Sequence, residues 1–171
     1  MLKRSKIGSI SSRVKDNTLH LEQLFPASPD VVYKAFTDRN ILSQWWGPNG
    51  WGLTFCEVDL QPGGAWHFCM TCQDESKEYF GQQSWGKAIY VEIDAPNKLV
   101  YRDCFSDAEG NIDPNTPETL VTLTFEPQAK YTKVRSTAEF PTKEELDQVM
   151  QMGLVVGITE TWSKLNLYLK R

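Results

Sequence analysis

The sequence has few of the residues on which most catalytic and metal sites depend. Its 171 residues include two histidines, His20 and His67, and four cysteines. It has no stretch near the roughly 18 consecutive apolar residues that a membrane-spanning helix needs, so we expect no membrane span. A net charge of −4 argues against nucleic-acid binding, which usually requires a basic face. The 40% of hydrophobic residues is typical of a globular domain, and we expect neither a metal ion nor a cofactor.

The cysteines do not follow a pattern that predicts a disulfide framework or a zinc site. No secretory signal precedes them, and only Cys69 and Cys72 have the C-x-x-C spacing of redox and zinc motifs. This pair ends an apolar segment that is typical of a strand, where positions three apart point to opposite faces. A redox pair is usually found at a helix N-terminus, and a zinc site needs further ligands. We therefore expect both cysteines to be structural.

Basic residues are concentrated in residues 1–16, and the rest of the chain is more acidic. This leader lacks the apolar run of a secretory signal, and we expect a disordered or frayed terminus, or one that pairs with a sheet edge; its Ser- and Arg-containing composition leaves a transit peptide as the alternative. Residues 17–171 are long enough for one domain that buries its core without a disulfide or metal. We expect it to be cytoplasmic, and exposed sheet edges would allow either a monomer or a homodimer.

Hydrophobic periodicity predicts an α+β fold in the order β-α-α-β6-α. A strand over residues 18–25 precedes two short helices, the first of which starts after Ser28. Alternating patterns between residues 51 and 140 predict six more strands with short connections, which favours antiparallel neighbours. From Thr142, apolar residues recur at helical spacing to the C-terminus, so we expect one long helix. The simplest packing is a curved antiparallel sheet wrapped round that helix.

Several segments carry a resemblance to a known family. They are Phe25–Pro29, Val32–Asp38, Trp45–Pro48, Cys56–Met70, Glu118–Phe125 and Met152–Leu169. In this order they resemble the family named after the activator of the heat-shock-protein-90 ATPase, over roughly residues 18–170. That family belongs to the START-like, helix-grip superfamily, whose fold is similar to that of the birch-pollen allergen. The resemblance implies a helix-grip fold with a cavity between the sheet and the C-terminal helix.

The resemblance does not imply a single function. Relatives bind lipids, antibiotics or polyketides, and a few are cyclases. The eukaryotic namesake acts on its chaperone with the help of an additional N-terminal domain, and residues 1–17 are too few to form one. Where relatives often carry two acids between the helix glycines, this chain has Leu154, Val155 and Val156. The helix is therefore more apolar than in those relatives.

Aromatic residues at alternating strand positions favour a cavity lined by rings. Trp66, Phe68 and Met70 share one strand face. In the helix, Gly153 and Gly157 remove bulk from the inward face, which indicates either close packing or room for a ligand. For any single residue, simple filling of the core is the alternative. The predicted lining consists of Trp45, Trp66, Phe68, Met70, Trp85, Tyr101, Phe105, Leu123, Met150, Gly153, Gly157 and Trp162.

Asp103 is the one candidate for acid or base chemistry in this cavity. It shares a strand face with Tyr101, and a carboxylate that faces an apolar cavity has a raised pKa. The alternative is an aspartate at a strand end that solvent reaches. His67 alternates with Trp66 and Phe68, so it should point away from the cavity if those two rings line it.

Three functions remain open. The first is binding of a hydrophobic small molecule, such as a lipid, a polyketide or an aromatic compound, with polar groups such as Tyr101, Asp103 or Thr161 setting specificity. The second is co-regulation of a chaperone ATPase through protein–protein contacts, which predicts an exposed patch. The third is a polyketide cyclase-like or hydrolase-like enzyme, which requires a titratable group with a shifted pKa inside the cavity.

Overall fold

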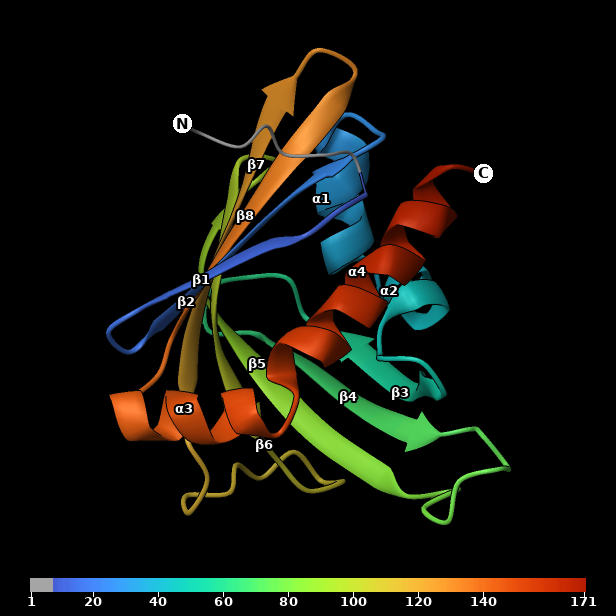
Figure 1. Cartoon of the computed structure of the whole chain (residues 1–171), viewed down its shortest axis with the longest axis vertical. Coiled ribbons are helices and arrows are strands. Elements are labelled where there is room, and N and C mark those ends of the chain that lie inside the picture. Colours follow the sequence, from blue (N-terminus) through green and yellow to red (C-terminus); the bar gives the residue numbers. More distant parts are fainter. Residues whose placement is uncertain (1–7) are drawn as a thin grey trace.

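The alternating segments of the sequence form one curved antiparallel sheet in the computed structural model, which describes residues 8–171 (Figure 1). Its strands are β1 (Ser11–Lys15), β2 (Thr18–Phe25), β3 (Trp51–Val58), β4 (Ala65–Cys72), β5 (Gln83–Asp94), β6 (Lys98–Phe105), β7 (Thr119–Gln128) and β8 (Tyr131–Glu139). They are ordered β1-β2-β8-β7-β6-β5-β4-β3. The predicted α+β helix-grip architecture is therefore confirmed.

Strand β1 lies within the segment that the sequence marks as a basic leader. It pairs along its whole length with β2, from Ser11 opposite Glu22 to Lys15 opposite Thr18. All of its residues are exposed to solvent. Residues 1–7 of the leader lie outside the described residues.

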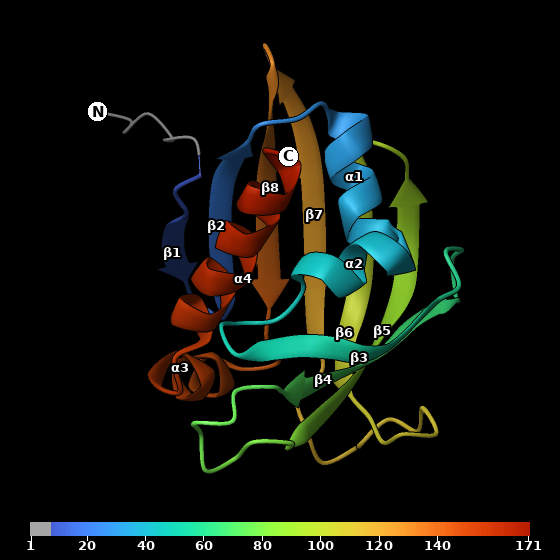
Figure 2. The ribbon, with the colours of Figure 1, turned by 90° about the vertical axis from the view of Figure 1, so that its right-hand side faces the viewer.

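Two short helices, α1 (Pro29–Thr37) and α2 (Arg39–Trp45), connect β2 to β3. Pro29 starts α1, where its fixed φ suits the first turn. Asp38 separates the two helices and caps the second, because its carboxylate accepts hydrogen bonds from the backbone N–H groups of Asn40 and Ile41. The helix pair lies on the concave side of the sheet, beside the C-terminal helix (Figure 2).

The predicted continuous C-terminal helix is in fact two helices, α3 (Lys143–Gln151) and α4 (Leu154–Leu169). Gly153 lies between them with a φ of +91°, in the left-handed region that residues with a Cβ rarely adopt. Helical periodicity continues across this glycine, so the pattern alone could not reveal the break. The longer helix, α4, crosses the concave face of the sheet as the helix-grip prediction requires (Figure 2).

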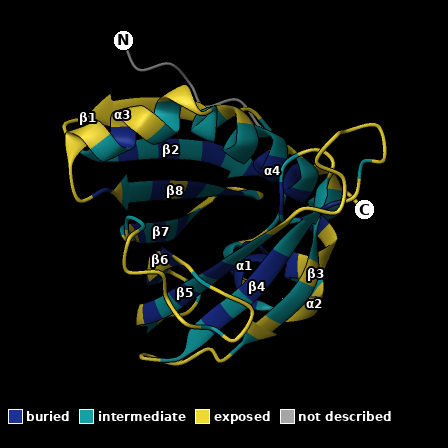
Figure 3. Cartoon of the chain, turned by 90° about the horizontal axis from the view of Figure 1, so that it is seen from below, coloured by how far each residue is buried: buried dark blue, intermediate teal, exposed yellow. Residues whose placement is uncertain are grey.

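Buried aromatic side chains fix α4 on the sheet. The ring of Trp162 meets the rings of Phe25 and Phe36 edge-on, with centroids 5.7 Å and 6.4 Å apart, respectively. Phe36 also packs against Phe125 of β7. Along the strands, buried residues alternate with more exposed ones, whereas α3 and the loops are mostly exposed (Figure 3). The core therefore fills the space where α1, α2 and α4 meet the sheet.

Candidate functional site

A cavity of about 460 Å3 lies between the concave face of the sheet and α4. Strands β2 and β4–β8, the segment Trp46–Pro48, and the first half of α4 contribute to its lining. Its size is within the range of small-molecule sites, on the order of 300–1,000 Å3. The sequence explains this position, because the alternating strands direct every second side chain toward α4.

Most residues predicted to line a ligand cavity border this one. They are Trp66, Phe68, Met70, Trp85, Tyr101, Phe105, Leu123, Gly153, Gly157 and Trp162, together with Asp103. Trp45 and Met150 do not border it. Trp45 is almost fully buried, and its indole N–H donates a hydrogen bond to the Ala35 carbonyl over 3.0 Å. Met150 packs against the edge of the core.

Trp46 occupies the position that the sequence pattern assigned to its neighbour. Helix α2 ends at Trp45, and Trp46 has an extended backbone, so the Trp46 ring borders the cavity while the Trp45 ring packs edge-on behind it, with centroids 5.3 Å apart. The Trp46 ring meets the ring of Trp66 edge-on with centroids 4.7 Å apart. The Gly47–Pro48 stop signal ends the helix here and could have identified the residue that leaves the helical pattern.

Gly86 of β5 allows the aromatic wall to lie flat against the sheet. A Cβ at this position would lie 2.5 Å from Cζ of Phe68, well inside van der Waals contact. The Phe68 ring is in turn 4.4 Å, between centroids, from that of Trp66. A glycine inside a strand often marks such a close approach, so the sequence contained a signal for this contact.

Trp85 and His67 contribute little to the cavity itself. Trp85 borders the cavity, but its indole packs against the rings of Phe55 and His67, which do not line it. Nε2 of His67 lies 3.1 Å from the carbonyl oxygen of Asp107. His67 is thus directed away from the cavity, as its alternation with Trp66 and Phe68 predicts, and neither histidine of the chain is a lining residue.

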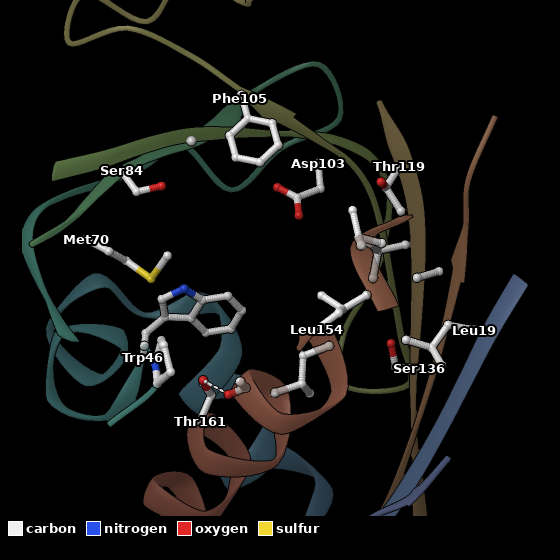
Figure 4. A pocket seen from close by; sticks show the side chains of 18 of the residues that line it. Leu19, Trp46, Met70, Ser84, Asp103, Phe105, Thr119, Ser136, Leu154 and Thr161 are labelled. Carbon is white, nitrogen blue, oxygen red and sulfur yellow. Dashed lines mark hydrogen bonds between the residues drawn. The ribbon is translucent and has the colours of Figure 1, made fainter. Parts of the chain in front are cut away.

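Asp103 points into the cavity from the end of β6 (Figure 4). It is paired in register with Ala88 of β5 and Thr119 of β7, and neither of these neighbours carries a charge. The Asp103 side chain is exposed to solvent, although the protein atoms around it desolvate the carboxylate in part. This desolvation raises the pKa of Asp103 to about 6.

No other charged side chain is present among the lining residues of the described chain. Arg102 precedes Asp103 in the chain and Lys87 lies opposite Cys104 in the sheet, but both are engaged elsewhere, because Arg102 pairs with Glu118 and Lys87 binds the Gly110 carbonyl. The remaining polar side chains include the hydroxyls of Ser84, Thr119, Ser136 and Thr161 (Figure 4). The cavity therefore combines apolar walls with one carboxylate and a few hydroxyl groups.

The middle of α4 is tied to the loop beside Trp46. Glu160 accepts hydrogen bonds from the backbone N–H and the side-chain amide of Asn49. Lys164 donates to the carbonyl oxygens of Pro48 and Trp51, over 3.4 Å and 3.1 Å. These contacts hold α4 beside the segment Trp46–Pro48, and both of them contribute to the cavity lining.

The described residues offer little for metal or redox chemistry. No three His, Cys, Asp or Glu side chains in residues 8–171 lie close enough together to hold a metal ion. Cys69 and Cys72, the pair with C-x-x-C spacing, are buried free thiols on β4. No helix in this part of the chain is long and apolar enough to cross a membrane.

Comparisons with known proteins agree with this geometry. A family model described as "Activator of Hsp90 ATPase homolog 1-like protein" matches residues 26–170. A solution structure of a protein from Arthrobacter aurescens is similar, with 25% identity, a TM-score of 0.83, and 96% of this chain and 92% of that chain covered. A solution structure from Staphylococcus epidermidis has 28% identity and a TM-score of 0.81, with 94% and 93% covered. A crystal structure from Mycobacterium smegmatis, 23% identical, shares the fold with a TM-score of 0.80 over 94% and 95%. No functionally curated protein matches the chain.

Proposed function

Because the chain belongs to the family of activator of Hsp90 ATPase homolog 1-like proteins, we propose that it binds a hydrophobic small molecule between the sheet and α4. The observation that carries this proposal is the cavity of about 460 Å3. Its lining is mainly aliphatic and aromatic, with few polar groups, which is the composition of small-molecule sites. A lipid, a polyketide or an aromatic compound would suit these walls, and binding would need no cofactor.

Co-regulation of a chaperone ATPase is the second candidate. It is supported by the family description and by apolar side chains at the cavity rim that face solvent. Met152 is 79% exposed and Phe105 is 52% exposed. Such residues could bury their surface against a partner protein.

A cyclase or hydrolase has less support. Asp103 would have to act without a second acid or base in the lining. The one thiol that borders the cavity, Cys104, has a pKa raised to about 11 by burial, so it is not a thiolate nucleophile at neutral pH. Cytoplasmic location and the monomeric or homodimeric state stay predictions.

An uncharged fluorescent dye, N-phenyl-1-naphthylamine, tests the binding proposal directly. We expect its fluorescence to rise and saturate with protein concentration. Ala138→Phe should weaken dye binding at least about tenfold, because Ala138 lines the cavity and the added ring would occupy it. Val14→Phe is the matched control, since Val14 is exposed on β1 and does not border the cavity.

Native mass spectrometry of the purified protein adds a second readout, namely a co-purifying molecule that Ala138→Phe displaces. If circular dichroism shows that Ala138→Phe does not fold, Thr119→Phe serves in its place. Absence of dye binding, or equal binding by the wild-type protein and a folded cavity variant, would contradict the proposal. Chaperone pull-down would then be the next experiment.

A further inference from the structure

Asp103 is a carboxylate without a partner. None of the described residues forms a hydrogen bond or an ion pair with it, and desolvation is the one influence that shifts its pKa. The groups beside it in the sheet are the methyl of Ala88 and the hydroxyl-bearing Thr119. Asp103 is exposed to the water that fills the cavity, and a ligand that displaced this water would leave the carboxylate in need of a cation or several hydrogen-bond donors. The protein supplies neither at this position.

Once a ligand displaces water from this carboxylate, the ligand itself is the remaining source of a cation. The lining contains no lysine, arginine or histidine, so a bound molecule would meet one negative charge and no positive charge. An anionic headgroup would be repelled by Asp103 in a desolvated site, where charges interact more strongly than in water. A neutral apolar molecule would leave the carboxylate unpaired and further desolvated.

We propose that the cavity selects an amphiphilic amine, a molecule with an apolar body and one basic nitrogen that pairs with Asp103. This inference rests on the proposed function and specifies its ligand class. Phe105 shares a strand face with Asp103 and also lines the cavity, so its ring can lie beside the ammonium group (Figure 4). The apolar body of the amine would occupy the region of Trp46, Trp66 and Phe68.

The pairing predicts a pH dependence that follows Asp103 alone. The other titratable lining groups are the Tyr101 phenol and the Cys104 thiol, and both have raised pKa values that keep them uncharged at neutral pH. Arg102 with Glu118, and Lys87 with the Gly110 carbonyl, are paired away from the cavity. Across the cavity, Glu160 and Lys164 of α4 bind the loop beside Trp46.

Three decyl compounds of equal chain length separate charge from apolar burial. Decylamine, decanol and decanoate would each be titrated against the bound dye N-phenyl-1-naphthylamine at pH 7.5. We expect decylamine to bind about tenfold or more tightly than decanol, since a charge-assisted hydrogen bond in a desolvated site contributes at least that factor. Decanoate should bind most weakly of the three.

Asp103→Asn assigns the preference to this carboxylate. In this variant, we expect the ratio of the decanol to the decylamine dissociation constant to fall to about one. Asp30→Asn is the matched control, because Asp30 is exposed on α1 and is not a lining residue, and it should keep the wild-type ratio. If Asp103→Asn does not fold, the wild-type protein at pH 5 replaces it, and the ratio should fall there as well.

The outcomes separate this inference from the function on which it rests. If the dye and decanol bind while decylamine binds no more tightly than decanol, the amine inference is overturned and small-molecule binding stands. Preference for decanoate, or an unchanged ratio in Asp103→Asn, also overturns it. If neither the dye nor any decyl compound binds, the proposed function fails together with the inference.

Discussion

Nζ of Lys164 lies 3.1 Å from the carbonyl oxygen of Trp51, and this hydrogen bond joins α4 to the strand that follows the Trp46 loop. Lys164 is partly buried, and desolvation lowers the pKa of its ammonium group. The ammonium group at the end of this partly buried side chain donates hydrogen bonds to the carbonyl oxygens of Pro48 and Trp51. The contact links the two sides of the cavity.

Lys164→Met should weaken this link. The substitution keeps the aliphatic stem but removes both hydrogen bonds, so we expect the free energy of unfolding to fall by about 1–2 kcal/mol. Urea denaturation measures the change, and Lys170→Met, at an exposed position after α4, is the control. Equal stability of the two variants would show that the hydrogen bonds contribute nothing.

The two helix glycines should respond in opposite ways to alanine. A Cβ on Gly157 would meet only Cβ of Pro48, at an ordinary 3.9 Å, so Gly157→Ala should stabilise the protein by about 0.5–1 kcal/mol through helix propensity. Gly153 has open space around it but a positive φ, so Gly153→Ala should destabilise by about 1 kcal/mol. Thermal unfolding of both variants tests this contrast. Equal shifts would mean that the α3–α4 junction does not depend on the left-handed residue.

Gly86→Ala should disturb the aromatic wall. The new methyl group would overlap the Phe68 ring, and overpacking of this kind costs about 1–3 kcal/mol of unfolding free energy. A double-mutant cycle with Phe68→Leu should recover part of that loss, because the smaller side chain leaves room for the methyl group. Additive losses in the double variant would show that the two positions are not in contact in solution.

Asp103 should make the unliganded protein less stable as the pH rises from about 4 to about 6. Its pKa is raised from 3.8 to about 6 in the folded state, so the folded protein holds the proton more tightly than the unfolded chain. The destabilisation by Asp103 is absent below the pKa that this carboxyl has in the unfolded chain. It is complete above the pKa that the carboxyl has in the folded protein. Asp103→Asn should therefore gain stability relative to the wild-type protein across this window and keep the gain at pH 7.

Urea midpoints at pH 4 and pH 7, for the wild-type protein and Asp103→Asn, measure this effect. Asp30→Asn is again the control, because it removes an exposed carboxylate. A difference between wild type and Asp103→Asn that does not change with pH would mean that the carboxylate is well solvated.

The strand pattern of the fold was predictable because alternation has a direct physical cause. The strand predicted over residues 18–25 is β2, and its alternating residues Leu19, Leu21 and Gln23 are all buried. The cavity-facing positions of β4 and β6 followed from the same two-residue period. By contrast, periodicity reports only which side of an element is apolar. It could not distinguish the core residue Trp45 from the cavity residue Trp46, which differ in backbone conformation.

Two further features were beyond the reach of a pattern. The break at Gly153 depends on a backbone angle, and an apolar sequence on both sides concealed it. The isolation of Asp103 depends on where Arg102 and Lys87 find other partners, which is settled by contacts across strands. The helix break and the lack of a cationic partner for Asp103 are both properties of the tertiary structure, although the residues concerned are visible in the sequence.

Strand β1 protects the edge of the sheet against pairing with a second copy of the chain. By pairing with β2 from Ser11 to Lys15, it occupies a row of backbone N–H and carbonyl groups that would otherwise face outward. Its own exposed side chains include Arg13 and Lys15, and like charges discourage a second copy from adding a strand there. A chain that began at residue 17 would present the longer, half-apolar β2 as its border, and we would expect such a chain to self-associate.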